Sequence, residues 1–226
     1  MFKKIFAFWK REGLLNQALE RTERMFKLVS ENFDIAEEEL IENLDVKRAN
    51  IYVTDQKINE CEKEVRRKVL EHLTINPKQD LSSSLILITV VKDLERIGDY
   101  VKNIVELAYH YPSKMEKNTY TEELIIISKK MSDVLKDSLR VFKEADVNKA
   151  KEYYKFYREV TKKTDAMTEK LLEETELKIR EAIVYALFAR YLKRIAAHLA
   201  NILTTVINPF HLVGYGFEDN KKEEIE

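Results

Sequence analysis

The chain has 226 residues, enough for one large domain or two small ones, and contains only four glycines and three prolines. Sheet-rich folds need turn residues about every 8–12 positions, so this composition excludes an all-β protein and argues against alternating strands and helices. Charged residues make up 35% and apolar residues 45% of the chain, as expected of helices that are half buried and half solvated. The sequence therefore predicts an all-α protein.

Proline breaks, polar links and capping residues divide the chain into six long helices. A helix of about 30 residues is roughly 45 Å long, and short links force neighbouring helices to run antiparallel. We therefore expect two tandem antiparallel three-helix bundles. The expected helices cover residues 14–44, 45 to the Asn76-Pro77 break, 80 to before Pro112, 124–142 after a polar link at 113–121, a stretch opened by Asp146, and 179–207.

The two bundles are predicted to be related by a tandem duplication. LERIGDYVKNI at 94–104 aligns with LKRIAAHLANI at 192–202, with five identities in eleven positions at a shift of 98 residues. Helical composition alone does not readily give this agreement. We expect the first bundle and an N-terminal extension in residues 1–112, the second bundle in 113–213, and an acidic, disordered tail in 214–226.

The sequence also indicates which kinds of partner and which cellular compartment to expect. The evidence is the charge balance, the cysteine content and the length of the apolar runs. Because 39 basic residues balance 40 acidic ones, no overall positive field attracts nucleic acid. The single cysteine, Cys61, cannot form an internal disulfide, which fits a reducing cytoplasm. The longest apolar run, 85–91, is much shorter than the about 20 residues that span a bilayer. We expect a cytoplasmic protein that does not bind nucleic acid.

Acidic residues in the second and third expected helices form a candidate metal site. Glu95 and Asp99 lie one turn apart on one helical face, although acid pairs at this spacing are also common on solvated faces. Asp55 and Glu62 are seven apart on the preceding helix, and an antiparallel turn near Pro77 places Asp55 level with Asp99 and Glu62 level with Glu95. Four converging carboxylates repel one another unless a cation intervenes. Oxygen ligands suit hard or borderline metals.

The second bundle lacks this set of acids. Lys193 and Ala197 stand at the positions of Glu95 and Asp99 under the 98-residue shift. A lysine in such a groove replaces a cation rather than binding one. We therefore expect a metal site in the first bundle only.

These residues resemble the first repeat of the PhoU family. The matching motifs are Asp55-x-x-Ile-Asn-x-x-Glu62-x-x-Val and Leu94-Glu-Arg-Ile-Gly-Asp99 followed by Asn103-Ile104, and the resemblance covers roughly residues 15–210. It implies two tandem bundles in a non-enzymatic regulator of phosphate uptake that is usually dimeric or higher, here expected to be a homodimer; the family also occurs as a domain of sodium–phosphate cotransporters. Such a regulator represses the phosphate-starvation response by contacting the phosphate ABC transporter, through its ATPase, and a sensor histidine kinase.

The same resemblance implies metal clusters held by the motif acids. Carried over to this chain, the metal ligands are Glu95 and Asp99, with Asp55 and Glu62 as supporting candidates. The ion is left open among iron, zinc, manganese and magnesium.

Other interpretations stay open. The chain could be a metal-buffering bundle without a signalling role, or a purely structural helical scaffold. A di-iron oxidase is disfavoured because none of the four histidines forms a Glu-x-x-His pair. The basic, aromatic segment Met1–Arg11 suggests peripheral contact with an anionic membrane, with docking onto the first bundle as the competing interpretation.

Overall fold

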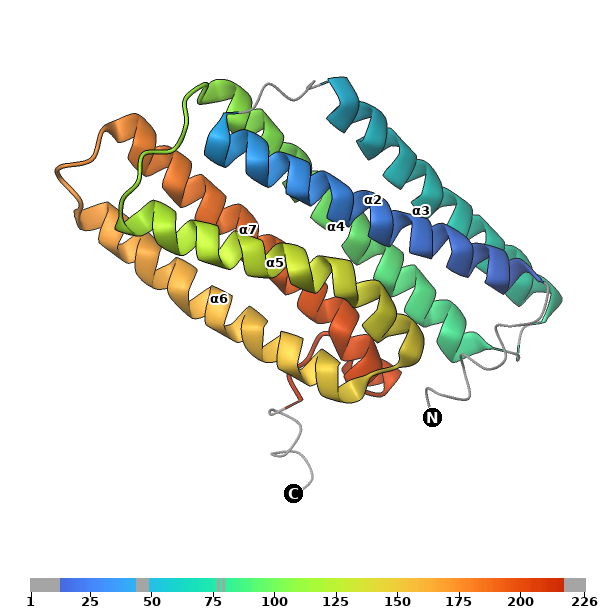
Figure 1. The fold of residues 1–226 in the computed structure, drawn as a ribbon. Helices are drawn as coiled ribbons and strands as arrows, with labels where there is room; N and C mark the ends of the chain where they lie inside the picture. The colour runs from blue at the N-terminus through green and yellow to red at the C-terminus, as the bar shows by residue number, and fades with distance from the viewer. Residues whose placement is uncertain (1–12, 44–48, 77, 79, 218–226) are drawn as a thin grey trace, which may run out of the picture.

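The computed structural model describes residues 13–43, 49–76, 78 and 80–217, and these residues form helices without any strand. The predicted all-α architecture of six long helices is confirmed. Figure 1 shows the helices lying side by side along one common direction. Their bounds are α2 Leu14–Glu42, α3 Ala49–Ile75, α4 Leu81–His110, α5 Thr119–Glu144, α6 Val147–Glu173 and α7 Ile179–Ile207, followed by the short 3-10 helix η1 Phe210–Leu212.

The helices form two three-helix bundles that share one core. Helices α2, α3 and α4 pack together, as do α5, α6 and α7. The bundles join because α4 packs on α7 and α2 packs on α5, which leaves α3 and α6 at opposite edges (Figure 1). Apolar side chains from both bundles belong to a single continuous cluster. None of the described helices is long and apolar enough to cross a membrane.

Capping residues explain where several helices begin. The Asn118 side chain accepts hydrogen bonds from the backbone N–H groups of Tyr120 and Thr121, both at 3.0 Å, and the Thr121 hydroxyl accepts one from the Asn118 N–H. This capping box starts α5 at Thr119, inside the segment expected to be a link. Asp146 accepts from the Lys149 N–H at 3.0 Å and caps α6, as the sequence predicts.

The third expected helix begins where the sequence predicts, because Asp80 directly precedes α4. This residue has a positive φ of 58°, and its carboxylate caps none of the described helical N–H groups. It lies instead 3.6 Å from Nε2 of His72. The expected start of the second helix at residue 45 lies outside the described residues. Helix α2 ends at Glu42, with Asn43 in the left-handed region at φ 53°.

The first residues of the expected tail pack on the second bundle. Asn208 Nδ2 donates to the carbonyl of Tyr215 at 2.9 Å, and the ring of Phe217 lies 5.5 Å from that of Tyr154. The expectation of disorder is therefore wrong for residues 214–217. Residues 218–226 and the segment Met1–Arg11 lie outside the described residues, and the boundary between residues 112 and 113 stays a prediction.

The contact between α4 and α7, which joins the two bundles, pairs residues at equivalent positions of the two repeats. Tyr100 corresponds to His198 under the 98-residue shift, and their rings stack with centroids 5.9 Å apart. Asp93, which is buried, lies 2.8 Å from Nδ1 of His198. The corresponding contact on the other side joins Tyr191 to Tyr100, with ring centroids 6.2 Å apart. The two repeats therefore meet back to back across an approximate two-fold axis.

Candidate functional site

The four predicted acids lie along the contact between α3 and α4, which we call the acidic seam: Asp55 and Glu62 on α3, Glu95 and Asp99 on α4. Apolar residues at helical spacing press the two helices together and leave these carboxylates at the edge of the contact. The buried apolar residues are Ile58, Cys61 and Val65 on α3 and Leu94, Ile97 and Val101 on α4.

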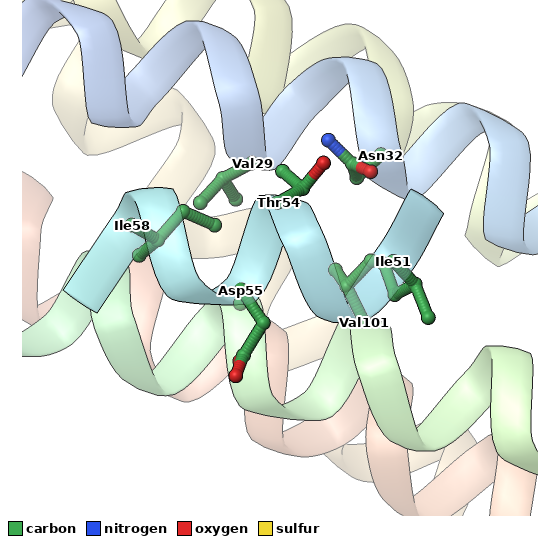
Figure 2. Close-up of a pocket in the computed structure, with 8 residues that line it drawn as sticks. Val29, Asn32, Ile51, Thr54, Asp55, Ile58 and Val101 are labelled. Carbon is green, nitrogen blue, oxygen red and sulfur yellow. The ribbon is translucent and has the colours of Figure 1, made fainter. Parts of the chain in front are cut away.

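Gly98 lies where α4 packs closely against α3. A Cβ atom at this position would lie 3.1 Å from Cδ1 of Ile58 on α3. Behind Asp55 the space between the helices is too small to admit a water molecule. Figure 2 shows the Asp55 side chain directed from α3 toward α4. Apolar side chains fill the space behind Asp55, so its carboxylate faces the other charged groups of the acidic seam.

One lysine binds two of the acids. Lys102 Nζ lies 3.0 Å from Oδ1 of Asp55 and 3.1 Å from Oδ1 of Asp99. Partial burial disfavours the charged ammonium, but hydrogen bonds to both carboxylates outweigh this effect and raise the pKa of Lys102. Asp55 and Asp99 thus lie at one level of the hairpin, on two sides of a single cation.

The other two acids pair with arginines of their own helix. Arg66 lies 2.6 Å from Glu62, and Arg96 contacts Glu95 at 3.5 Å and Asp99 at 3.3 Å. The arginine side chains are about half exposed, at 48% and 52%. Ion pairs of this kind are worth at most about 1 kcal/mol each, so they hold the carboxylates only weakly.

The Glu95 carboxyl is affected by the charges of the other three acids of the acidic seam. Burial is the largest cause that raises the pKa of this carboxyl, and the charge of Asp99 raises it further against the opposing charge of Arg96. The charges of Glu62 and Asp55 also contribute in the raising direction. The other three carboxylates are therefore close enough to Glu95 for each to repel it.

The raised pKa of Glu95 predicts a pH-dependent stability. Below the pKa that the Glu95 carboxyl has in the unfolded chain, this group is protonated in both the folded and the unfolded state. As the pH rises from there through the raised pKa of the folded state, ionisation of the carboxyl increasingly disfavours folding. Glu95→Gln should therefore stabilise the protein at pH 7, by up to about 1 kcal/mol in this partly solvated site, and have no effect at pH 4. Urea unfolding at the two pH values measures this difference. Equal gains at both values, or a loss at pH 7, would contradict it, and the exposed Glu169→Gln on α6 is the control.

The second bundle holds a partly exposed ion pair at the corresponding place. Lys193, which replaces Glu95, lies 2.5 Å and 2.8 Å from the two carboxylate oxygens of Asp165 on α6. Ala197 stands at the position of Asp99 and supplies no charge. In this bundle one lysine and one acid compensate each other across the helices.

The acidic seam is not arranged as a closed ligand cage. Among the residues that the structure describes, no three His, Cys, Asp or Glu side chains lie close enough together to hold one metal ion. Sequence reasoning identified the acids but missed Lys102, which is seven residues after Glu95 and three after Asp99. That spacing places it on the same helical face and was the signal that could have found it.

The fold and site define a class of all-helical proteins made of two homologous three-helix bundles. The sequence model of the PhoU domain matches this chain twice, over residues 22–108 and 124–206. The chain belongs to the PhoU family, as its motifs predict.

Relatives with names and solved structures agree with this assignment. The chain is 30% identical over 191 residues to the phosphate-specific transport system accessory protein PhoU homolog 1 of Thermotoga maritima, covering 81% of this chain and 82% of the relative. It is 27% identical over 198 residues to the PhoU homolog of Synechocystis, covering 84% and 88%. The crystal structure of PhoU from Pseudomonas aeruginosa matches with a TM-score of 0.76 at 21% identity, covering 86% of this chain and 95% of that one.

Proposed function

We propose that this chain is an accessory regulator of phosphate transport that acts through protein contacts rather than catalysis. The observation that carries the proposal is the pair of PhoU-domain matches, which together span most of both bundles. The curated relatives from Thermotoga maritima and Synechocystis are named accessory proteins of phosphate-specific transport systems, and this chain covers most of each.

The partners proposed from the family resemblance are the ATPase of the phosphate ABC transporter and a sensor histidine kinase. Deletion of the gene, followed by measurement of phosphate uptake and cellular phosphate, tests this role. A regulator that represses uptake predicts excess phosphate in the deletion strain and a return to normal on complementation. Unchanged uptake would contradict regulation. A homodimer in the cytoplasm remains the expected state.

We also propose that the acidic seam binds a metal ion. The donor set consists of carboxylate oxygens, which suit iron, manganese, magnesium or zinc. The seam also binds a positive charge already, since the Lys102 ammonium lies between Asp55 and Asp99. Asp55, Glu95 and Asp99 would have to move closer together to hold the ion, with Glu62 in support, because no three such side chains lie close enough in the described structure. A bound metal would neutralise the repelling carboxylates and tie α3 to α4.

Removal of two of these carboxylates is expected to abolish most of the metal affinity. Glu95→Gln/Asp99→Asn keeps the side-chain shapes but removes two charges. Loss of a supporting group costs about 10–100-fold in metal affinity, so loss of two ligands should cost at least about 100-fold. Calorimetric titration with Mn²⁺, Fe²⁺ and Zn²⁺ measures the change.

A matched control lies on α6. Glu169 and Glu173 have the same four-residue spacing on an exposed surface, and Glu169→Gln/Glu173→Gln should leave metal binding unchanged. Equal affinity of the wild type and the seam variant would contradict the proposed site. A wild-type protein that binds none of these ions would favour the structural scaffold, and metal binding without an effect on phosphate uptake would favour the metal buffer.

A further inference from the structure

Four basic residues of α6 lie along one line of the helix surface, which we call the basic stripe: Lys151, Lys155, Arg158 and Lys162. Their spacing of four, three and four residues places them on one helical face. The last three are exposed, and α6 lies at one edge of the described structure (Figure 1). Like charges at this spacing repel one another, so the basic stripe favours an anionic neighbour.

The acids near the basic stripe are compensated by other lysines. The next acid on the same face, Glu169, is seven residues beyond Lys162, a rise of about 10 Å. In the described part of the chain, none of the four stripe residues lies within ion-pair distance of a carboxylate. The acids that flank the stripe are paired with lysines outside it: Glu152 with Lys149, Glu159 with Lys130 and Lys163, and Asp165 with Lys193.

The chain returns to the basic stripe at Phe217. The ring of this residue lies 5.5 Å from the ring of Tyr154 and 5.4 Å from Nζ of Lys151. The residues that follow, 218–226, have the sequence EDNKKEEIE, with five acids and two lysines. We call them the acidic segment. It begins one residue after a side chain that contacts the first lysine of the stripe.

We propose that the acidic segment binds along the basic stripe of the same chain. The segment covers the four stripe residues, so that a partner with an acidic surface reaches them only by displacing it. This inference depends neither on the proposed metal site nor on the proposed role in phosphate transport.

The lengths of the stripe and the segment agree. Lys151 and Lys162 are eleven residues apart on a helix, which corresponds to about 17 Å. An extended chain advances about 3.3 Å per residue. The two acidic pairs of the segment, 218–219 and 223–224, are five residues apart and are therefore also separated by about 17 Å at full extension. They can reach opposite ends of the stripe.

Attachment to the same chain compensates for the weakness of each contact. Ion pairs between exposed side chains are individually weak and are screened by salt. Phe217 holds the start of the acidic segment beside Lys151, so the segment is present at an effective concentration in the millimolar range. Its two lysines reduce its negative charge without cancelling it. We therefore expect an intramolecular contact that weakens as the ionic strength rises.

Carbodiimide cross-linking of the full-length protein tests this inference, because the reagent joins a lysine amine to a carboxylate beside it. Mass spectrometry of the digested protein then identifies the joined residues. Links from the acidic segment to Lys155 and Lys162 should exceed links to Lys63, an exposed lysine of α3 at the opposite edge, by at least about tenfold. Their yield should fall severalfold at about 1 M salt, where the Debye length is only about 3 Å.

Arg158→Gln weakens the stripe without adding or removing a cross-linking group, because the reagent joins neither arginine nor glutamine to carboxylates. This variant should give about twofold fewer links, or fewer still, from the acidic segment to Lys155 and Lys162, since one exposed ion pair is lost. Arg190→Gln, at an exposed position of α7, makes the same change in net charge and should leave the yield unchanged. Circular dichroism checks that both variants keep the helix content of the wild type.

Salt-sensitive links within one chain to Lys155 and Lys162 would support the inference. Absence of these links, or equal yields at Lys63, would overturn it and leave the basic stripe to an acidic partner. Links between labelled and unlabelled chains in an isotopically mixed sample would show that the segment binds a second copy instead. Equal yields in the wild type and Arg158→Gln would show that the charge of the stripe does not hold the segment.

Discussion

Phe142→Ala is expected to lower the free energy of unfolding by about 3–5 kcal/mol, the range for removal of a buried aromatic ring. Phe142 is 1% exposed on α5, and its ring lies 5.8 Å from that of Phe26 on α2. The ring thus fills the contact between the bundles, and rigid helices on both sides limit how far the cavity can collapse. Chemical unfolding followed by circular dichroism measures the loss.

The control for this prediction is a large apolar residue outside the core. Leu172 on α6 is 83% exposed, and Leu172→Ala should change the free energy of unfolding by no more than about 0.5 kcal/mol. A loss below about 1 kcal/mol for Phe142→Ala would contradict the close packing of α2 against α5 described above.

His198→Ala is expected to cost about 2 kcal/mol at the other contact between the bundles. Asp93 is 8% exposed, and its partners are Nδ1 of His198 at 2.8 Å and Nδ2 of Asn201 at 3.3 Å. Loss of the imidazole leaves a buried carboxylate with only the longer hydrogen bond among these contacts, and an unsatisfied buried group costs about 1–3 kcal/mol. Stacking on Tyr100 is lost as well.

A double-mutant cycle isolates the interaction between Asp93 and His198. Asp93→Asn/His198→Ala should lose less stability than the sum of the two single changes, with a coupling of about 0.5–3 kcal/mol. His211→Ala, at an exposed position of η1, should be neutral. Strict additivity would show that the histidine contributes through its volume rather than through the carboxylate.

Local signals in the sequence were sufficient to predict most helices and the family. The sixth expected helix coincides with α7, Ile179–Ile207, because an Asn-Pro pair terminates a long apolar pattern. The capping role of Asp146 was also predicted correctly. The start of a helix at Asp80 was also predicted correctly, although this residue lies in the left-handed conformation and makes no side-chain hydrogen bond to the helical N–H groups.

The joint between the bundles was not predicted, for a physical reason. Helical periodicity shows that a face is apolar but does not identify the helix that covers it. α4 and α7 are apolar around much of their circumference, which is typical of helices buried on more than one side. That property was the signal that could have indicated a second packing partner for each helix. The pairing of Asp93 with His198 depends on the register between distant segments, which only the folded chain specifies.

For the site, spacing alone predicted the common seam of the acids but not the cations beside them. The level shared by Asp55 and Asp99 follows from antiparallel packing about a short turn. A lysine has many rotamers, so its helical position narrows the possible partners of Lys102 without selecting one. The predicted role of the acids as metal ligands stays a prediction that titration can test.

The ion pair between Lys193 and Asp165 also bears on how the duplicated halves have diverged. Lys193 neutralises Asp165 without a dissolved ion and Ala197 supplies no carboxylate, so we expect the C-terminal half to bind no metal. If the acidic seam of the N-terminal half binds a dissolved ion as proposed, one molecule combines a bundle with a fixed charge balance and a second bundle that responds to the ion. Titration with a metal ion should then saturate at one bound ion per chain. Any resulting conformational change should be confined to the N-terminal bundle.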